Sequence, residues 1–297
     1  MRDAPPAAGA VYRNMDRATL DRQYSPSSRV PSLDAYLREY ERLSEAARRD
    51  HPVRASLAYG PHPVERLDYF PASGAGRAPL LVFVHGGNWQ ALGRAESAFP
   101  VPPLLAAGAA VAVIEYGLAP EVGLDAMAGM VRRAVDWLLT HADGLGFAPD
   151  RLHLCGTSAG AHLAAMALLP DVSGGPDVSG RIAGAVLLSG LYDLEPVRLS
   201  YVNDALRLDE AAARRNSPVL RLPARLPGTV VARGGNETEE YVRQHDRMVT
   251  ALRLRAVVTE VVADRRDHFD LPYDLGVAGT GLGDAVLAQM GLEGTTA

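Results

Sequence analysis

The chain alternates short apolar runs with helix-like stretches, and this alternation constrains its fold more than any other feature. Several of the runs are continuously apolar, as expected for strands that are buried on both faces of a sheet. We therefore predict the α/β class, with a mostly parallel sheet flanked by helices. The expected strands cover residues 64–70, 80–84, 110–116, 152–155, 182–188, 229–232 and 257–262. The expected helices cover residues 124–140, 159–169, 237–254 and 282–290.

Residues 1–54 are charged and favour a helical N-terminal extension. Leu37, Tyr40 and Leu43 are spaced three apart, which gives one apolar stripe on a helix. We expect residues 1–54 to pack as a cap on one catalytic domain that spans residues 55–297. The 297 residues are 47% hydrophobic and 22% charged, which is ordinary globular usage for a chain long enough to bury a deep core.

Charge and composition limit the kinds of molecule that we expect this protein to bind. The net charge is −5 and no basic run stands out, so we expect no nucleic-acid partner. No apolar run approaches the roughly 20 residues that span a bilayer, and the first residues lack the pattern of a signal peptide. These features, with the single Cys155 as a buried strand residue, predict a cytoplasmic protein without an internal disulfide. The oligomeric state is not readable, and a homodimer stays open.

A nucleophile motif follows the expected strand at residues 152–155. Gly156-Thr157-Ser158-Ala159-Gly160 matches G-x-S-x-G, and a helical run begins directly after it. In α/β-hydrolases this motif places serine on a sharp strand-to-helix turn with its hydroxyl exposed. The five-residue pattern alone also occurs in ordinary glycine-rich turns, but here the strand, turn and helix are all present. Ser158 is therefore the candidate nucleophile.

A second motif follows the strand at residues 80–84. His85-Gly86-Gly87 resembles an oxyanion loop, whose backbone N–H groups typically contribute about 3 kcal/mol each to an acyl-transfer transition state. We assign the backbone N–H groups of Gly87, Asn88 and Ala159 as donors. His85 precedes the glycines, and we expect it to hold the loop in place.

The base and its orienting acid should follow later strands. His268 comes directly after the strand at residues 257–262, where the order serine, acid, histidine requires a base. Glu237 follows the strand at residues 229–232 and is the first choice for the acid, with Asp193 as its rival one strand earlier. Three further acids lie too near His268 in sequence to fold back onto its ring, and we expect them to cap the loop or face solvent: Asp264, Asp267 and Asp270.

The motifs resemble the kynurenine formamidase (arylformamidase) group of α/β-hydrolases, which is close to the hormone-sensitive-lipase-like esterases. Residues 85–90 are similar to that family's H-G-G-Y-W-Q, and residues 237–244 to its D-S-x-E-F-x-R-Q. The second match implies that Glu237 is the triad acid, ahead of Asp193. Further similar blocks lie at residues 96–99, 116–120, 132–138, 156–163, 189–196 and 267–269. The chain departs from the pattern at Asn88, where the family has tyrosine, and at Glu237, where it has aspartate.

The resemblance implies a serine hydrolase that cleaves a small aryl formamide, such as N-formylkynurenine, or a short-chain ester through an acyl-enzyme. Trp89 and Tyr192 are candidates to line the substrate pocket, although large aromatics at strand ends are as often core residues. The alternatives are a carboxylesterase or lactonase, a tailoring hydrolase of a biosynthetic pathway, and a binding protein that kept only the fold. We expect no cofactor and no metal, because the remaining histidines show no paired ligand spacing.

Overall fold

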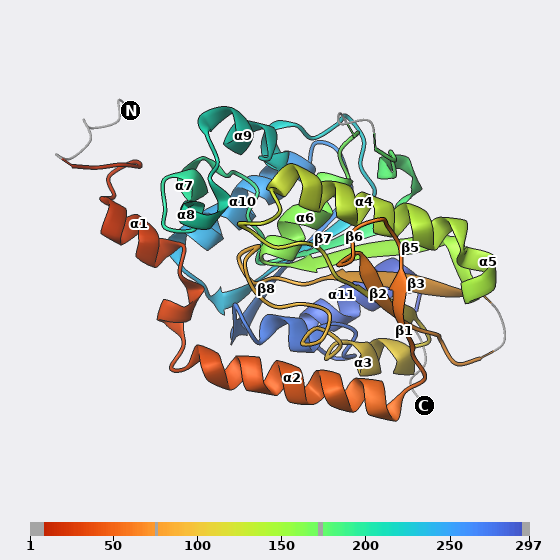
Figure 1. Cartoon of the computed structure of the whole chain (residues 1–297). Helices are drawn as coiled ribbons and strands as arrows, with labels where there is room; N and C mark the ends of the chain where they lie inside the picture. Colours follow the sequence, from red (N-terminus) through yellow and green to blue (C-terminus); the bar gives the residue numbers. More distant parts are fainter. Residues whose placement is uncertain (1–8, 75–76, 172–174, 293–297) are drawn as a thin grey trace.

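An eight-stranded sheet runs through the centre of the molecule (Figure 1). The computed structural model describes residues 9–74, 77–171 and 175–292. The strand order is β1-β2-β4-β3-β5-β6-β7-β8, and β2 is antiparallel to both of its neighbours while every other pair is parallel. The predicted mostly parallel α/β sheet is confirmed. Its strands are β1 (Arg54–Ala58), β2 (Arg66–Phe70), β3 (Ala78–Val84), β4 (Ala110–Ile114), β5 (Phe147–Thr157), β6 (Gly184–Leu188), β7 (Gly228–Asn236) and β8 (Val258–Asp267).

Helices cover both faces of the sheet (Figure 1). The α-helices are α1 (Arg17–Gln23), α2 (Leu33–Asp50), α3 (Val101–Ala106), α4 (Leu124–Thr140), α5 (Ala142–Leu145), α6 (Ala159–Ala167), α7 (Glu195–Arg198), α8 (Asn203–Leu206), α9 (Glu210–Arg215), α10 (Glu239–Leu252) and α11 (Gly281–Met290). Short 3-10 turns are η1 (Pro26–Arg29), η2 (Ser179–Arg181), η3 (Pro218–Leu220) and η4 (Leu271–Asp274). In the described part of the chain, none of these helices combines the length and apolarity of a bilayer span.

Alternation along the central strands divides the core into two layers. Leu80 and Val82 of β3 pack with the helices α4, α6 and α10 on one face. Leu81 and Phe83 pack with α2, α3 and α11 on the other face. Because successive side chains of a strand point to opposite faces, a continuously apolar strand needs a helix layer on both sides.

The observed elements differ from the expected ones in several places, of which three bear on the site or on the sheet. β1 was not expected, because its segment is only five residues long and contains no continuous apolar run, and it is largely exposed in the structure. β8 continues to Asp267, so the loop with His268 begins directly at a strand end. α10 begins at Glu239, two residues later than expected, because Thr238 caps the helix by accepting a hydrogen bond from the Tyr241 N–H. Glu237 therefore lies in the loop between β7 and α10.

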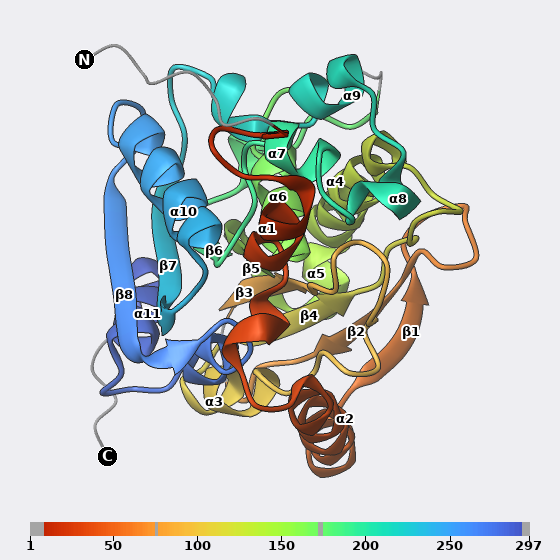
Figure 2. The same cartoon turned by 90° about the vertical axis from the view of Figure 1, so that its left-hand side faces the viewer.

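The N-terminal segment crosses the carboxyl edge of the sheet before it reaches the far face. Figure 2 looks onto this edge and shows α1 and η1 in front of the strands, with α2 continuing beneath. A buried charge anchors the far end of α2, where Arg48 Nε lies 3.0 Å from Asp68 Oδ2 and Arg94 Nη1 lies 2.6 Å from Asp68 Oδ1. The carboxyl edge is thus covered by residues that come from the start of the chain.

The close approach of α6 to β3 predicts a specific cost at Gly160. A Cβ at this position would lie 2.1 Å from the Val84 carbonyl oxygen, whereas a Cβ at Gly129 of α4 meets only the Arg133 side chain at 3.4 Å. Gly160→Ala should lower the free energy of unfolding by about 1–3 kcal/mol or more through overpacking. Gly129→Ala should be neutral or stabilising by up to about 1 kcal/mol, as alanine favours a helix. Urea unfolding measures both, and equal effects would contradict the packing described.

Candidate active site

Ser158 occupies a sharp turn between β5 and α6. Its φ of 54° and ψ of −119° are sparsely populated for a residue with a side chain, which is the strained geometry expected of a nucleophile elbow. The turn is held because the Ser158 N–H donates to the Leu188 carbonyl at the end of β6, at 2.8 Å. The geometry places the serine at the carboxyl edge of the sheet, at the first turn of α6.

The loop after β3 brings a row of backbone N–H groups to the same place. Gly87, Asn88 and Trp89 have φ values of 98°, 52° and 60°, so three consecutive residues turn left-handed. Within the described residues, the N–H groups of Gly87 and Asn88 have no hydrogen-bond acceptor. Ala159 is the first residue of α6, where a backbone N–H has no acceptor inside the helix. The three predicted oxyanion donors therefore flank Ser158 from two different elements.

The side chain of His85 supports the loop after β3 through ring stacking and hydrogen bonds. Its buried ring stacks on Tyr116, with centroids 4.2 Å apart, and its Nδ1 lies 2.9 Å from the Gly86 carbonyl oxygen. The Tyr116 hydroxyl donates to the carbonyl oxygens of His85 at 2.9 Å and of Gly86 at 3.3 Å. Glu115 Oε1 lies 3.2 Å from His85 Nε2. These contacts hold the loop in its conformation, which is the structural role predicted for His85 from its position before the two glycines.

Glu237 and His268 meet where β7 and β8 end. Asn236 pairs with Asp267 as the last pair of the two strands, so the acid and the histidine are each the next residue along. His268 Nδ1 lies 3.1 and 3.2 Å from the two carboxylate oxygens of Glu237, and each of the two residues is only 5% exposed. The Ser189 hydroxyl donates to Glu237 Oε1 at 2.5 Å. This second donor, to which no sequence motif pointed, binds the carboxylate oxygen that also lies 3.2 Å from His268 Nδ1, and it helps to hold the carboxylate in place.

The rival acid lies elsewhere. Asp193 pairs with Arg247 and accepts a hydrogen bond from the Glu195 N–H at 3.2 Å, so its carboxylate serves α10 and the start of α7. Asp267 accepts from the backbone N–H groups of Phe269 and Asp270, at 2.8 and 3.1 Å, which is the loop-capping role expected for it. The imidazole of His268 has Glu237 as its carboxylate partner.

Tyr241 lies beside the nucleophile and the base. Its ring meets the His268 ring edge-on, with centroids 4.7 Å apart. The hydroxyl is buried and makes no hydrogen bond of full geometry with the described residues. Burial raises the pKa of Tyr241 above its usual range, the Glu237 carboxylate raises it further, and the neighbouring Ser158 hydroxyl opposes the increase. Tyr241 is therefore a neutral phenol next to Ser158, at a position where the family pattern quoted above has phenylalanine.

Ser158 and His268 open into a cavity of about 340 Å³. Its wall combines the N-terminal segment, the oxyanion loop, the elbow and the base loop, and it is lined by Pro26, Ser27, Leu33, Leu37, Tyr40, Gly86, Gly87, Asn88, Gln90, Ala91, Leu92, Thr157, Ser158, Tyr201, His268 and Phe269. Apart from His268, none of these lining residues has an acidic or basic side chain. A larger and shallower hollow of about 750 Å³ lies along α10 and contains none of the predicted triad residues.

Trp89 and Tyr192 belong to the core instead of the pocket wall. Both side chains are fully buried, and neither is among the residues that line the cavity. The positive φ of Trp89 turns its ring inward, where Nε1 donates to His162 Nδ1 at 3.2 Å. The Tyr192 backbone N–H donates to Gln244 Oε1 at 2.9 Å. The cavity wall that these two aromatics were expected to form is instead formed in part by residues of the N-terminal segment, among them Leu33 and Leu37.

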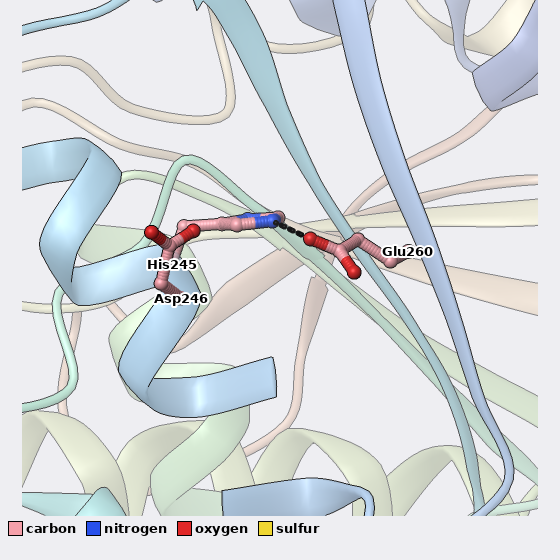
Figure 3. A group of neighbouring side chains, drawn as sticks. All are labelled: His245, Asp246 and Glu260. Atoms are coloured by element: carbon pink, nitrogen blue, oxygen red, sulfur yellow. Dashed lines mark hydrogen bonds and ion pairs between the residues drawn. The ribbon is translucent and has the colours of Figure 1, made fainter. Parts of the chain in front are cut away.

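One group of potential metal ligands lies apart from this cavity. Among the described residues, His245 and Asp246 of α10 and Glu260 of β8 bring three ligand atoms within 4.8 Å of one another (Figure 3). Figure 3 shows His245 Nε2 directed at Glu260 Oε1, 3.2 Å away. Arg253 pairs with the other oxygen of Glu260 at 2.6 Å. That arginine already supplies the positive charge a cation would bring, so the group works as a polar link between α10 and β8.

Comparisons with known proteins found relatives that match most of the chain. Kynurenine formamidase of Danio rerio is 35% identical over 276 residues, which cover 88% of this chain and 92% of that protein. Kynurenine formamidase of Salmo salar is 34% identical over 297 residues, which cover 94% of this chain and 98% of that protein. The chain belongs to the kynurenine formamidase family. A family model described as BD-FAE also matches residues 67–173.

Solved structures extend the likeness to other α/β-hydrolases. A candidate thioesterase from Silicibacter sp. TM1040 is 29% identical and has a TM-score of 0.78, covering 90% of this chain and 98% of that one. An esterase from Pyrobaculum calidifontis, 17% identical with a TM-score of 0.68 over 93% of this chain and 97% of that one, shares the fold. The protein is thus a hydrolase of the α/β-hydrolase superfamily.

The geometry predicts the ranking of the two candidate acids. Glu237→Gln should lower kcat by roughly 10⁴-fold, because the amide no longer holds the imidazole in the required tautomer or stabilises its cation. Asp193→Asn is the matched control and should cost much less, since its carboxylate contacts Arg247 and not His268. Steady-state kinetics on a p-nitrophenyl ester measures both variants. A larger loss in Asp193→Asn would move the acid one strand earlier.

Proposed function

We propose that this protein hydrolyses a small, neutral aryl formamide or short-chain aryl ester through an acyl-enzyme on Ser158. The observation that carries the proposal is the meeting of Ser158, the His268–Glu237 pair and unpaired backbone N–H groups at one apolar cavity. Acyl transfer needs a nucleophile, a base with an orienting acid, and donors for the oxyanion. The named activity of the Danio rerio and Salmo salar relatives supports the formamide side of this proposal.

In the proposed reaction, Ser158 Oγ attacks the substrate carbonyl while His268 Nε2 takes the hydroxyl proton. Glu237 holds the other ring nitrogen and stabilises the imidazolium. The oxyanion accepts hydrogen bonds from the N–H groups of Gly87, Asn88 and Ala159. The imidazolium then protonates the departing arylamine or phenol, and water, deprotonated by His268, releases formate or another short acid and restores Ser158.

Residues 1–54 act in this proposal as the cap that completes the cavity. Five lining residues come from the described part of this extension: Pro26, Ser27, Leu33, Leu37 and Tyr40. Their side chains are mainly apolar, which suits an aromatic leaving group. An apolar wall also excludes water from the cavity, and this strengthens the electrostatic interactions among the triad side chains.

A carboxylesterase is the second candidate, and Asn88 is the observation that favours it. The family's tyrosine at this position would fill space beside the oxyanion donors, whereas asparagine leaves room for an acyl group longer than formyl. Asparagine also tolerates the positive φ of 52° better than tyrosine. A relative from Arabidopsis thaliana named as a probable isoprenylcysteine α-carbonyl methylesterase is 34% identical over 150 residues, which cover 48% of this chain and 32% of that protein, and its name describes an ester substrate.

A substrate panel tests the proposal. We expect wild-type protein to hydrolyse formanilide and p-nitrophenyl acetate, and to hydrolyse formanilide at least as well as N-formylkynurenine. The reason is that the amino-acid tail of N-formylkynurenine finds no acidic or basic partner among the described lining residues other than His268. The measurement is kcat/KM for each substrate. Turnover of none of them, or a strong preference for the charged tail, would contradict the proposal.

The role of Asn88 is tested on the same panel extended to p-nitrophenyl butyrate. Asn88→Tyr should shift the preference from butyryl towards formyl and acetyl, by about 1–3 kcal/mol per methylene excluded. Asn88→Ala is the control, because it removes the amide without filling the space and should leave the order of chain lengths unchanged. If both variants keep the wild-type ratios, position 88 does not set acyl specificity.

A further inference from the structure

Every residue that flanks the acid and the base in the sequence is hydrogen-bonded to the same N-terminal segment. Asn236 and Thr238 stand on either side of Glu237, and Asp267 and Phe269 stand on either side of His268. All four contact residues 23–40, a segment that comprises the end of α1, η1 and the first half of α2. We call residues 23–40 the N-terminal clasp.

On the acid side, the clasp binds both neighbours of Glu237. Asn236 Nδ2 donates to the Arg29 carbonyl oxygen at 2.9 Å, and Arg29 Nε donates back to Asn236 Oδ1 at 3.1 Å. Thr238 Oγ1 donates to the Gln23 carbonyl oxygen at 2.6 Å. Three hydrogen bonds thus hold the two residues on either side of Glu237.

On the base side, two tyrosines of α2 hold the neighbours of His268. The Tyr36 hydroxyl donates to Asp267 Oδ2 at 2.6 Å, and the Tyr40 hydroxyl donates to the Phe269 carbonyl oxygen. The rings of Tyr36 and Phe269 pack with centroids 5.4 Å apart. The hydrogen bond to Asp267 raises the pKa of Tyr36 to about 12.

The sheet does not hold these loops by itself. Regular pairing of β7 with β8 runs from Thr229 opposite Val258 to Gly234 opposite Ala263, and it is then broken by an irregularity before Asn236 meets Asp267. The acid and the base follow that last pair and lie beyond the regular ladder. Contacts from outside the two strands therefore add to this last pair in fixing one loop relative to the other.

We propose that the N-terminal clasp positions Glu237 and His268 relative to each other, so that the segment which closes the cavity also sets the rate of the chemical step. The inference rests on the proposed catalytic roles of these two residues. It separates two functions of the extension. Leu33 and Leu37 line the cavity, whereas Tyr36 and Arg29 do not, and the latter two act only through the loops they hold.

Tyr36→Phe tests the proposal, because it removes one hydroxyl and leaves the cavity wall unchanged. We expect kcat on p-nitrophenyl acetate to fall about 10-fold, since a misplacement of about 1 Å at a reacting group costs roughly 10²-fold, while KM changes less than about 2-fold. Tyr69→Phe is the matched control, as it removes a buried tyrosine hydroxyl that donates to the Leu145 carbonyl oxygen at 2.9 Å, outside the site. Its kcat should stay at the wild-type value.

A double-mutant cycle distinguishes positioning from a general loss of stability. In a Glu237→Gln background the acid–base pair is already broken, so adding Tyr36→Phe should change kcat by less than about 2-fold. Arg29→Ala, which removes one contact on the acid side, should repeat the pattern of Tyr36→Phe. A loss of the same size in both backgrounds, or a wild-type kcat in Tyr36→Phe and Arg29→Ala, would overturn the proposal.

A readout independent of turnover keeps the inference separate from the proposed function. The proton shared by His268 Nδ1 and Glu237 should give a downfield resonance in one-dimensional proton NMR of the wild type. It should broaden or shift in Tyr36→Phe and stay unchanged in Tyr69→Phe. An unchanged resonance in Tyr36→Phe contradicts the clasp even if the protein hydrolyses its substrates. Failure to hydrolyse any substrate, with the resonance responding as expected, would contradict only the proposed function.

Discussion

The pairing of Asn236 with Asp267 is the constraint on which the active-site geometry depends. It is the last contact between β7 and β8, and the next residue on each strand is the acid or the histidine. A slip of one residue would exchange the side-chain directions along the whole strand and separate Glu237 from His268. The distance of about 3 Å between the carboxylate and the imidazole thus follows from strand register as much as from the two side chains.

The remaining parts reach the same place because the sheet is parallel. β3, β5, β7 and β8 all end at one edge, so the loop after β3, Ser158, Glu237 and His268, to which we assign the catalytic roles, come together there although they are far apart in sequence. Residues of the N-terminal extension lie across this edge (Figure 2), line the cavity, and make hydrogen bonds to the loops that carry Glu237 and His268. One segment therefore shapes the cavity and supports the residues beneath it.

Local patterns explain why the sequence was sufficient for part of the site. The motif around Ser158, the glycines after β3 and the position of His268 after a strand each specify their own geometry within a few residues. Local patterns did not distinguish Glu237 from Asp193 as the acid. That choice depended on the resemblance of residues 237–244 to a family block. Trp89 and Tyr192 were assigned to the pocket by residue type, but the left-handed turn at Trp89 directs that ring into the core. The contacts of Arg29 and Tyr36 join residues 207 and 231 positions apart, and no local pattern reveals such pairs.

The central claim is that Ser158 is an activated nucleophile. Labelling with a fluorophosphonate, followed by peptide mass spectrometry, tests it most directly, because the reagent requires the base and the oxyanion donors as well as the serine. We predict one adduct per chain, on Ser158, formed rapidly in wild-type protein and absent in Ser158→Ala. An adduct on another residue, or no reaction with folded wild-type protein, would contradict the account.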